Sequence, residues 1–117
     1  MKDNLYYMNK ALELAAHAAD TGEVPVGAVV VCNDTGEIIG CGFNRREHDF
    51  NPLAHAEIEA IYQASQKLGR WRLSGCSLYV TLEPCAMCCG AIINSRIDYV
   101  FFGAYDKKSG SAVSVQQ

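Results

Sequence analysis

Two short strings of this sequence contain the residue types of a metal site: His55-Ala56-Glu57 and Cys85-Ala86-Met87-Cys88. One imidazole and two thiols suit a soft-to-borderline ion such as Zn²⁺. Three protein ligands leave one position of a tetrahedral ion open, and an open position is typical of a catalytic zinc. Glu57 is close to the imidazole without being an obvious ligand. We therefore expect its carboxylate to move protons for a water at the ion.

The spacing of these residues indicates a role for each. Cys85 and Cys88 are three residues apart, so on a helix they share one face and can grip one ion. His55 and Glu57 are two apart, which supports a ligand and a base better than two ligands. Cys89 could replace Cys88, but the order P-C-x-x-C favours Cys88, and we expect Cys89 to pack inward. A lone C-x-x-C is more often structural or redox-active, whereas the upstream His-x-Glu argues for a metal.

Hydrophobic periodicity predicts the elements that position these residues. A first helix ends near Gly22 and has one apolar face, made of Leu5, Met8, Leu12, Ala15 and Ala19. The other predicted elements are strands at Val24–Cys32 and Glu37–Asn44, a helix at Ala54–Leu68, a strand at Ser77–Leu82, a helix at Pro84–Asn94 and a strand at Ile97–Gly103. Each metal-binding string thus opens a helix, where the partial positive charge of the N-terminus favours a thiolate.

The order of these elements indicates the fold class. The turn Asn33–Gly36 joins the first two strands in a hairpin. The last two strands are joined through a helix, so we expect them to be parallel, with a right-handed crossover. We predict an α/β fold, a three-layer α/β/α sandwich with a mixed central sheet. Gly27, Gly40 and Gly42 inside the strands mark either bulges or places where a ligand comes close to the backbone.

Length and composition are those of an ordinary globular domain. Of the 117 residues, 50% are apolar and 20% charged, and the net charge is −3. Proteins that bind nucleic acid without specificity are usually basic, so this net charge argues against that role. Six cysteines in a chain with a substantial apolar core do not indicate a disulfide scaffold. We find no secretory signal and no segment of transmembrane length. We predict one domain over residues 1–117, reduced thiols, no membrane partner and a cytoplasmic location.

Three longer strings narrow this interpretation. They are V-P-V-G-A at residues 24–28, T-L-E-P-C at residues 81–85 and G-A-Y-D at residues 103–106. With Asn44 and the two metal-binding strings, they make the chain resemble the bacterial tRNA-specific adenosine deaminases, which have a cytidine deaminase-like fold. The similarity runs from about Leu12 to Gly110. The order H-x-E … P-C-x-x-C by itself is common to zinc-dependent nucleobase deaminases.

The resemblance implies an activity and a cofactor. The activity is hydrolytic deamination of adenosine to inosine at the wobble position of a tRNA anticodon. The cofactor is one Zn²⁺ per chain, with His55, Cys85 and Cys88 as ligands. Glu57 matches the proton shuttle of the family.

The resemblance also implies substrate contacts and an assembly. Asn44 would contact the nucleoside, the backbone at Ala54 would read the base, and Asp106 would meet the RNA near the target base. The amide groups around Glu83 and Pro84 would help to hold the attacking oxygen. Family members form homodimers whose active sites are completed across the interface. They also have C-terminal helices, an extension that we expect this chain to lack.

Two other functions share part of the pattern. A deaminase of a free base or nucleotide, such as guanine or a cytosine derivative, would use the same zinc ligands, and the acidic net charge fits it. A non-catalytic, zinc-stabilised RNA-binding subunit would keep the ligands but would not need Glu57. The cluster Arg70-Trp71-Arg72 could clasp RNA, although such a loop more often combines packing with solvated charge. His17 and His48 are expected on the surface and not among the ligands.

Overall fold

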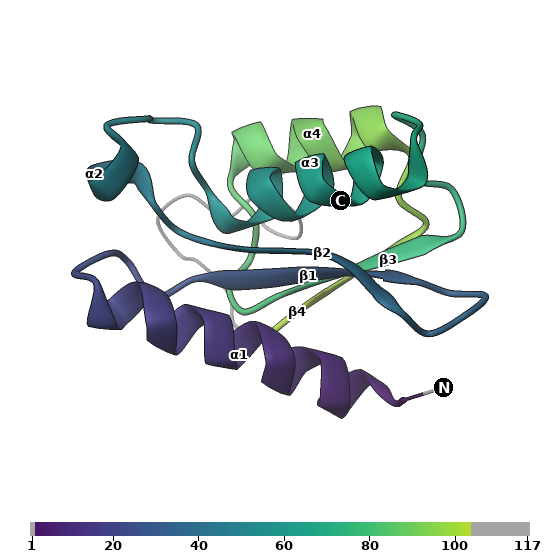
Figure 1. The fold of residues 1–117 in the computed structure, drawn as a ribbon, viewed down its shortest axis with the longest axis horizontal. Helices are drawn as coiled ribbons and strands as arrows, with labels where there is room; N and C mark the ends of the chain where they lie inside the picture. Colours follow the sequence, from purple (N-terminus) through teal and green to yellow (C-terminus); the bar gives the residue numbers. More distant parts are fainter. Residues whose placement is uncertain (1, 104–117) are drawn as a thin grey trace.

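A computed structural model describes residues 2–103 of the chain (Figure 1). Its elements are α1 (Asn4–Asp20), β1 (Gly27–Cys32), β2 (Ile38–Phe43), α2 (Arg46–Asp49), α3 (Ala56–Leu68), β3 (Cys76–Val80), α4 (Ala86–Ser95) and β4 (Tyr99–Phe102). Only the short α2 was not predicted, because its residues read as a loop. Asp106 and the tail from Lys107 lie outside the described residues. Among the described helices, none has the length and apolar character needed to cross a bilayer.

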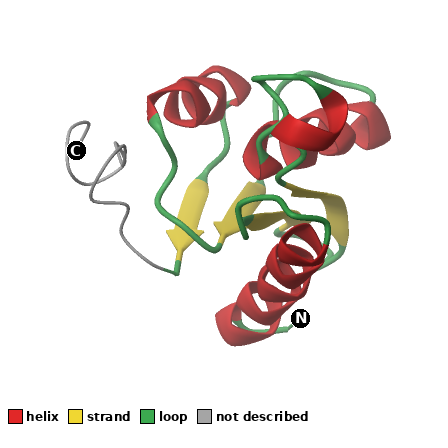
Figure 2. Cartoon of the chain, turned by 90° about the vertical axis from the view of Figure 1, so that its left-hand side faces the viewer, coloured by secondary structure: helices red, strands yellow, loops and turns green. Residues whose placement is uncertain are grey.

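The four strands form a mixed sheet in the order β2-β1-β3-β4. β1 is antiparallel to both β2 and β3, whereas β3 and β4 are parallel. Helix α1 covers one face of the sheet, and α3 and α4 cover the other (Figure 1). In Figure 2 the strands lie between the helix at the N-terminus and the remaining helices. The predicted three-layer α/β/α sandwich, its hairpin and its parallel strand pair are confirmed.

Helix α1 packs on the sheet through a face that coincides only in part with the predicted one. The residues that it buries are Tyr7, Ala11, Ala15 and Ala18. Leu5 and Leu12, on the predicted face, are 67% and 50% exposed. The prediction was right for Ala15 and for Met8, which packs against the core, and wrong for the two leucines, because the helix lies so near the sheet that mostly methyl groups fit between them.

The strand glycines explain this short distance between helices and sheet. Cβ atoms added to them would collide with helix backbone: Gly27 with Ala11 of α1, Gly40 with Ala60 of α3, and Gly42 with Ala56 of α3. The glycines therefore make room for helices and not for a ligand, which corrects one of the two interpretations. The bulge interpretation holds beside Gly40, where the β1–β2 register shifts.

Candidate metal centre and base pocket

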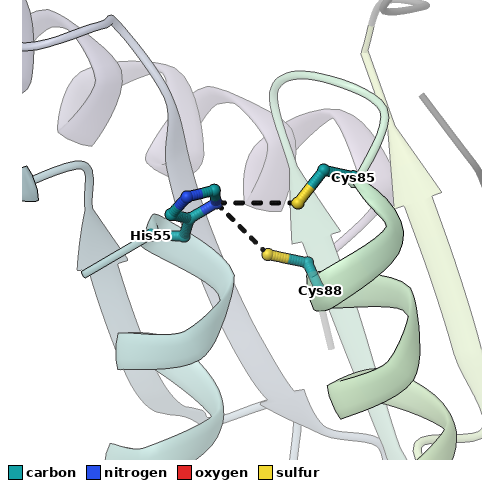
Figure 3. A group of neighbouring side chains, drawn as sticks. All are labelled: His55, Cys85 and Cys88. Carbon is teal, nitrogen blue, oxygen red and sulfur yellow. Dashed lines mark hydrogen bonds between the residues drawn. The ribbon is translucent and has the colours of Figure 1, made fainter. Parts of the chain in front are cut away.

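The three predicted ligands meet where two neighbouring helices begin. His55 is the N-cap of α3 and Cys85 is the N-cap of α4, both with extended backbone angles, and Cys88 lies in the first turn of α4. In Figure 3 a ring nitrogen of His55 faces both sulfurs across the gap between the helices. Both helices begin two residues later than predicted, at Ala56 and Ala86. The prediction that each string opens a helix is confirmed.

The distances between the donor atoms fit a tetrahedral zinc ion. His55 Nδ1 lies 3.8 Å from Cys85 Sγ and 3.5 Å from Cys88 Sγ. The three donor atoms all lie within 4.8 Å of one another. Zn–N bonds of about 2.0 Å and Zn–S bonds of about 2.3 Å at tetrahedral angles place nitrogen and sulfur about 3.5 Å apart. Within residues 2–103, no other group of His, Cys, Asp and Glu gathers in this way.

The charges around these donors also favour a cation. Burial raises the pKa of the Cys88 thiol, and the neighbouring Glu57 and Cys85 raise it further. A divalent ion offsets the free-energy cost of ionising the Cys88 thiol, because it stabilises both thiolates at once. Burial lowers the pKa of the His55 imidazole, and Arg46 lowers it further, so the neutral ligand form is favoured. Neither α3 nor α4 has a side-chain hydrogen bond from its N-cap, and the positive ends of both helix dipoles adjoin the sulfurs.

Glu57 lies beside the ligands without joining them. It is in the first turn of α3, only 4% exposed, and its carboxyl interacts with the Cys88 thiol. Burial raises the pKa of this carboxyl. The buried position keeps the group away from bulk water, within reach of whatever enters the adjoining pocket. This placement suits an acid–base group better than a fourth ligand.

A pocket of about 130 Å³ opens beside the donors. Its walls are Val24, Val26, Asn44, Arg46, His55, Glu57, Leu82, Glu83 and Cys85. Pockets for drug-sized ligands hold roughly 300–1,000 Å³. This smaller pocket suits a single planar base, with any attached sugar and phosphate outside.

The five predicted substrate contacts differ in their position around this pocket. Asn44 and Glu83 line it, while Ala54 and Pro84 are buried and are not among its walls. The Ala54 carbonyl accepts a hydrogen bond from the Arg45 N–H. Asp106 lies outside the described residues. All five roles therefore stay predictions.

Two residues of the site were not found from the sequence. Arg46 lines the pocket, and Glu23 holds the segment that carries Arg46. The buried Glu23 carboxylate accepts hydrogen bonds from the N–H of Glu47 at 3.2 Å and of His48 at 2.7 Å. It thus caps α2 from a distant part of the chain and fixes the segment between Asn44 and His55. Its only sequence signal was an acidic residue next to an apolar strand, which indicates no partner.

Three other residues considered from the sequence lie outside the metal-binding group. Cys89 packs inward as expected, with its thiol directed at the Pro84 carbonyl at 3.6 Å. His17 and His48 are exposed and lie outside the ligand cluster.

Trp71 is exposed between Arg72 and Arg96. It borders a groove between α3 and α4 and not the base pocket, which favours the interpretation as packing plus solvated charge.

Comparisons with known proteins agree with this geometry. Residues 1–104 match the cytidine and deoxycytidylate deaminase zinc-binding region. A protein of Bacillus subtilis (strain 168) named tRNA-specific adenosine deaminase is 50% identical over 110 residues, covering 94% of this chain and 67% of that protein.

Two solved structures extend the similarity to the fold. One comes from biochemical and structural studies of A-to-I editing by tRNA:A34 deaminases at the wobble position of transfer RNA. It superposes with a TM-score of 0.88 at 44% identity, over 92% of this chain and 77% of that chain. The other is guanine deaminase from Bacillus subtilis, with a TM-score of 0.84 at 38% identity, over 89% of this chain and 66% of that chain.

Replacing Cys88 by serine should abolish zinc binding, whereas Cys89→Ser should leave it intact. Cys88 faces His55 Nδ1, and the adjacent Cys89 faces the Pro84 carbonyl. We expect about one zinc per chain in the parent and in Cys89→Ser, and less than a tenth of that in Cys88→Ser. Elemental analysis of the purified proteins measures this difference. Equal zinc in both variants would contradict the assigned ligand set.

Proposed function

Because this chain belongs to the cytidine and deoxycytidylate deaminase family of zinc-binding domains, we propose that it deaminates the wobble adenosine of a tRNA anticodon to inosine by hydrolysis. The meeting of His55, Cys85 and Cys88 beside the buried Glu57 supports the reaction. The names of the Bacillus subtilis relative and of the A-to-I editing structure support the substrate. We propose that residues 1–117 act as a single deaminase domain.

The ligand residues prepare the site for its metal. A bound Zn²⁺ supplies Lewis acidity, which makes water a strong nucleophile at neutral pH. His55 offers Nδ1 in the neutral form, and the N-termini of α3 and α4 favour the thiolates of Cys85 and Cys88. Because Cys88 and Glu57 are buried, bulk water does not compete for the ring atoms of a base in the pocket.

Glu57 moves the protons in this proposal. One of its carboxylate oxygens takes a proton from the attacking water and passes it to N1 of the adenine ring. The water oxygen bonds to C6, and the carboxylate then takes the remaining proton from that oxygen and delivers it to the exocyclic nitrogen. The C6–N bond then breaks, ammonia leaves, and the oxygen stays on the ring as the carbonyl of inosine. Water supplies all the atoms that the base gains.

The pocket walls hold the base for this attack. The side chain of Asn44 would bind the nucleoside, and the backbone at Ala54 would read the edge of the base. The amide groups around Glu83 and Pro84 would hold the attacking oxygen, and Asp106 would contact the RNA beside the target. The small volume of the pocket supports entry of a single flipped-out base.

A second candidate is deamination of a free base such as guanine. The observation that favours it is the similarity to guanine deaminase from Bacillus subtilis at 38% identity. A pocket sized for one base accepts either a free base or a flipped one. A non-catalytic RNA-binding subunit is less well supported, because the buried Glu57 has no purpose in a purely structural zinc site.

A substrate panel tests both the activity and the role of Glu57. The zinc-loaded protein is incubated with an anticodon stem-loop carrying a wobble adenosine, and separately with guanine and with cytidine. We expect inosine from the stem-loop only. Glu57→Gln keeps the size of the side chain but removes the base, so turnover should fall about 10²–10⁴-fold while zinc remains bound. Chromatography of the digested RNA measures inosine.

Three outcomes of this panel would contradict the proposal. Conversion of guanine or cytidine in place of the stem-loop would identify a free-base deaminase. Full turnover by Glu57→Gln would remove the proton role. If the zinc-loaded parent binds the stem-loop and converts none of the substrates, the non-catalytic interpretation is correct.

Arg46 offers a test that separates RNA from a free base. Its exposed side chain borders the pocket, where the phosphates of a bound anticodon would pass. Arg46→Gln should weaken stem-loop binding and reduce the slope of log K against log salt by about 0.7 to 1. Binding titrations at several salt concentrations measure this slope. Lys67→Gln, which removes a positive charge at the far end of α3, is the control and should leave the slope unchanged. An unchanged slope in Arg46→Gln would contradict an RNA contact there.

We also propose that the protein is a cytoplasmic homodimer. A groove between α3 and α4 is lined by apolar and aromatic side chains that include Ile58, Ile61, Tyr62 and Trp71. The groove begins at Ile58, next to Glu57. A second copy seated there would therefore adjoin the base pocket, consistent with active sites completed across an interface. The cytoplasmic location follows from the proposed tRNA substrate.

Sedimentation of two matched variants tests the dimer. Tyr62 and Tyr99 are 63% and 61% exposed, but only Tyr62 lies in the groove. Tyr62→Glu should weaken self-association more than about tenfold, because it places a charge in an apolar interface. Tyr99→Glu should sediment like the parent. A monomeric parent, or equal behaviour of both variants, would argue against this interface.

A further inference from the structure

Two cysteines lie side by side at the end of the sheet opposite the metal centre. Cys32 is the last residue of β1, and Cys76 is the first residue of β3. They are register partners in the antiparallel β1–β3 pair. The ligands Cys85 and Cys88 follow the other end of β3, so the length of the strand separates this pair from the metal centre. Both thiols are free in the structure.

The backbone hydrogen bonds show which kind of pair this is. The Cys32 N–H donates to the backbone carbonyl of Glu37 at 2.9 Å, and the Cys32 carbonyl accepts from the N–H of Gly36 at 2.8 Å. The Cys76 N–H donates to the carbonyl of Leu73 at 3.2 Å, and the Cys76 carbonyl accepts from the N–H of Asp98 at 3.0 Å. The backbone groups of the two residues thus point away from each other. This is the non-hydrogen-bonded type of antiparallel pair, in which Cα atoms lie about 4.5 Å apart and side chains are closest.

Both side chains project to the same face of the sheet. Cys76 belongs to the buried core under α3 and α4, and Cys32 packs against that same core. A Cα separation of about 4.5 Å falls inside the range of roughly 4.4–6.8 Å that disulfides span. We propose that Cys32 and Cys76 are an oxidation site, at which a peroxide converts the two thiols to a reversible disulfide.

The surroundings of the two sulfurs assign their order of reaction. Cys32 is half-buried beside the exposed turn, while Cys76 is fully buried. Hydrogen bonds from Thr35 lower the pKa of the Cys32 thiol, and burial raises the pKa of the Cys76 thiol. Accessible cysteines with a lowered pKa beside a second cysteine are typical of redox-sensitive pairs. Cys32 therefore reacts first, and Cys76 closes the bond.

The chemistry balances with hydrogen peroxide as the oxidant. The Cys32 thiolate attacks one peroxide oxygen, the O–O bond breaks, and a sulfenic acid and hydroxide form. The Cys76 sulfur then attacks the Cys32 sulfur, and the S–O bond breaks. The oxygen leaves as water with the proton of the Cys76 thiol. The two thiols lose two electrons, the peroxide becomes two waters, and a dithiol restores the pair by exchange.

Peptide mapping of the zinc-loaded protein tests this proposal. The protein is treated with hydrogen peroxide, blocked with an alkylating agent, and digested with trypsin, a glutamate-specific protease and chymotrypsin. These cleavages place Cys32, Cys41 and Cys76 in separate peptides, apart from the metal ligands. We expect a linked Cys32–Cys76 peptide that has lost two hydrogen atoms and that a dithiol separates. A chromogenic chelator in the same sample should report no zinc release.

Variants keep this test decisive. Cys41 is the matched control, because it lies on β2 and packs on the opposite face, under α1. Cys41→Ser should form the linked peptide as the parent does, and Cys32→Ser should not. Cys76→Ser should stop at the Cys32 sulfenic acid, which a cyclic dione traps. Without the linked peptide in the parent, or with a Cys85–Cys88 link and zinc release in its place, the proposed site is wrong.

Discussion

One small ion has to be reached by side chains from two different helices, and this requirement governs the arrangement of the domain. The donor atoms of His55, Cys85 and Cys88 must stay within tenths of an ångström of tetrahedral spacing. Helices α3 and α4 therefore have to begin at the same end of the sheet and on the same face. The N–H of Gly27 donates to the Thr81 hydroxyl at 3.2 Å, and the Thr81 N–H donates to the Gly27 carbonyl at 3.1 Å. These bonds tie the start of β1 to the end of β3. From the end of β3 the chain runs into Cys85.

Close contact between helices and sheet supplies the required accuracy. Ala56, Ala60 and Ala64 recur every fourth residue along α3 and lie over the glycines of β2. Backbone packed on backbone has few alternative positions, because a small shift produces either a collision or a void. Larger side chains of α3, such as Ile58 and Ile61, project sideways into the groove beside α4. The stiff layer beneath the ligands thus positions the site more firmly than bulky side chains would.

Cysteine residues have different surroundings, and therefore different chemistry, at the two ends of the sheet. At one end, Cys85 and Cys88 lie at a helix N-terminus beside an imidazole and a carboxylate, and a cation stabilises them. At the other end, Cys32 and Cys76 are partners across a strand pair, and within residues 2–103 no third donor joins them in a metal-binding group. Cysteine identity alone does not distinguish these cases. The neighbours that each thiol acquires in the folded sheet determine whether it suits a metal or an oxidant.

The sequence by itself determined the features that depend on residues near one another in the chain. The spacing of Cys85 and Cys88, the opening of a helix by each metal-binding string, the hairpin and the parallel pair all follow from local patterns. Only the tertiary structure decided which face of α1 is buried, that Glu23 caps α2, that Arg46 borders the pocket, and that Cys32 lies opposite Cys76. Local patterns record what a segment prefers, whereas these features depend on the distance between segments and on strand register. The distances between segments and the strand register are set only when the strands pair and the helices pack on the sheet.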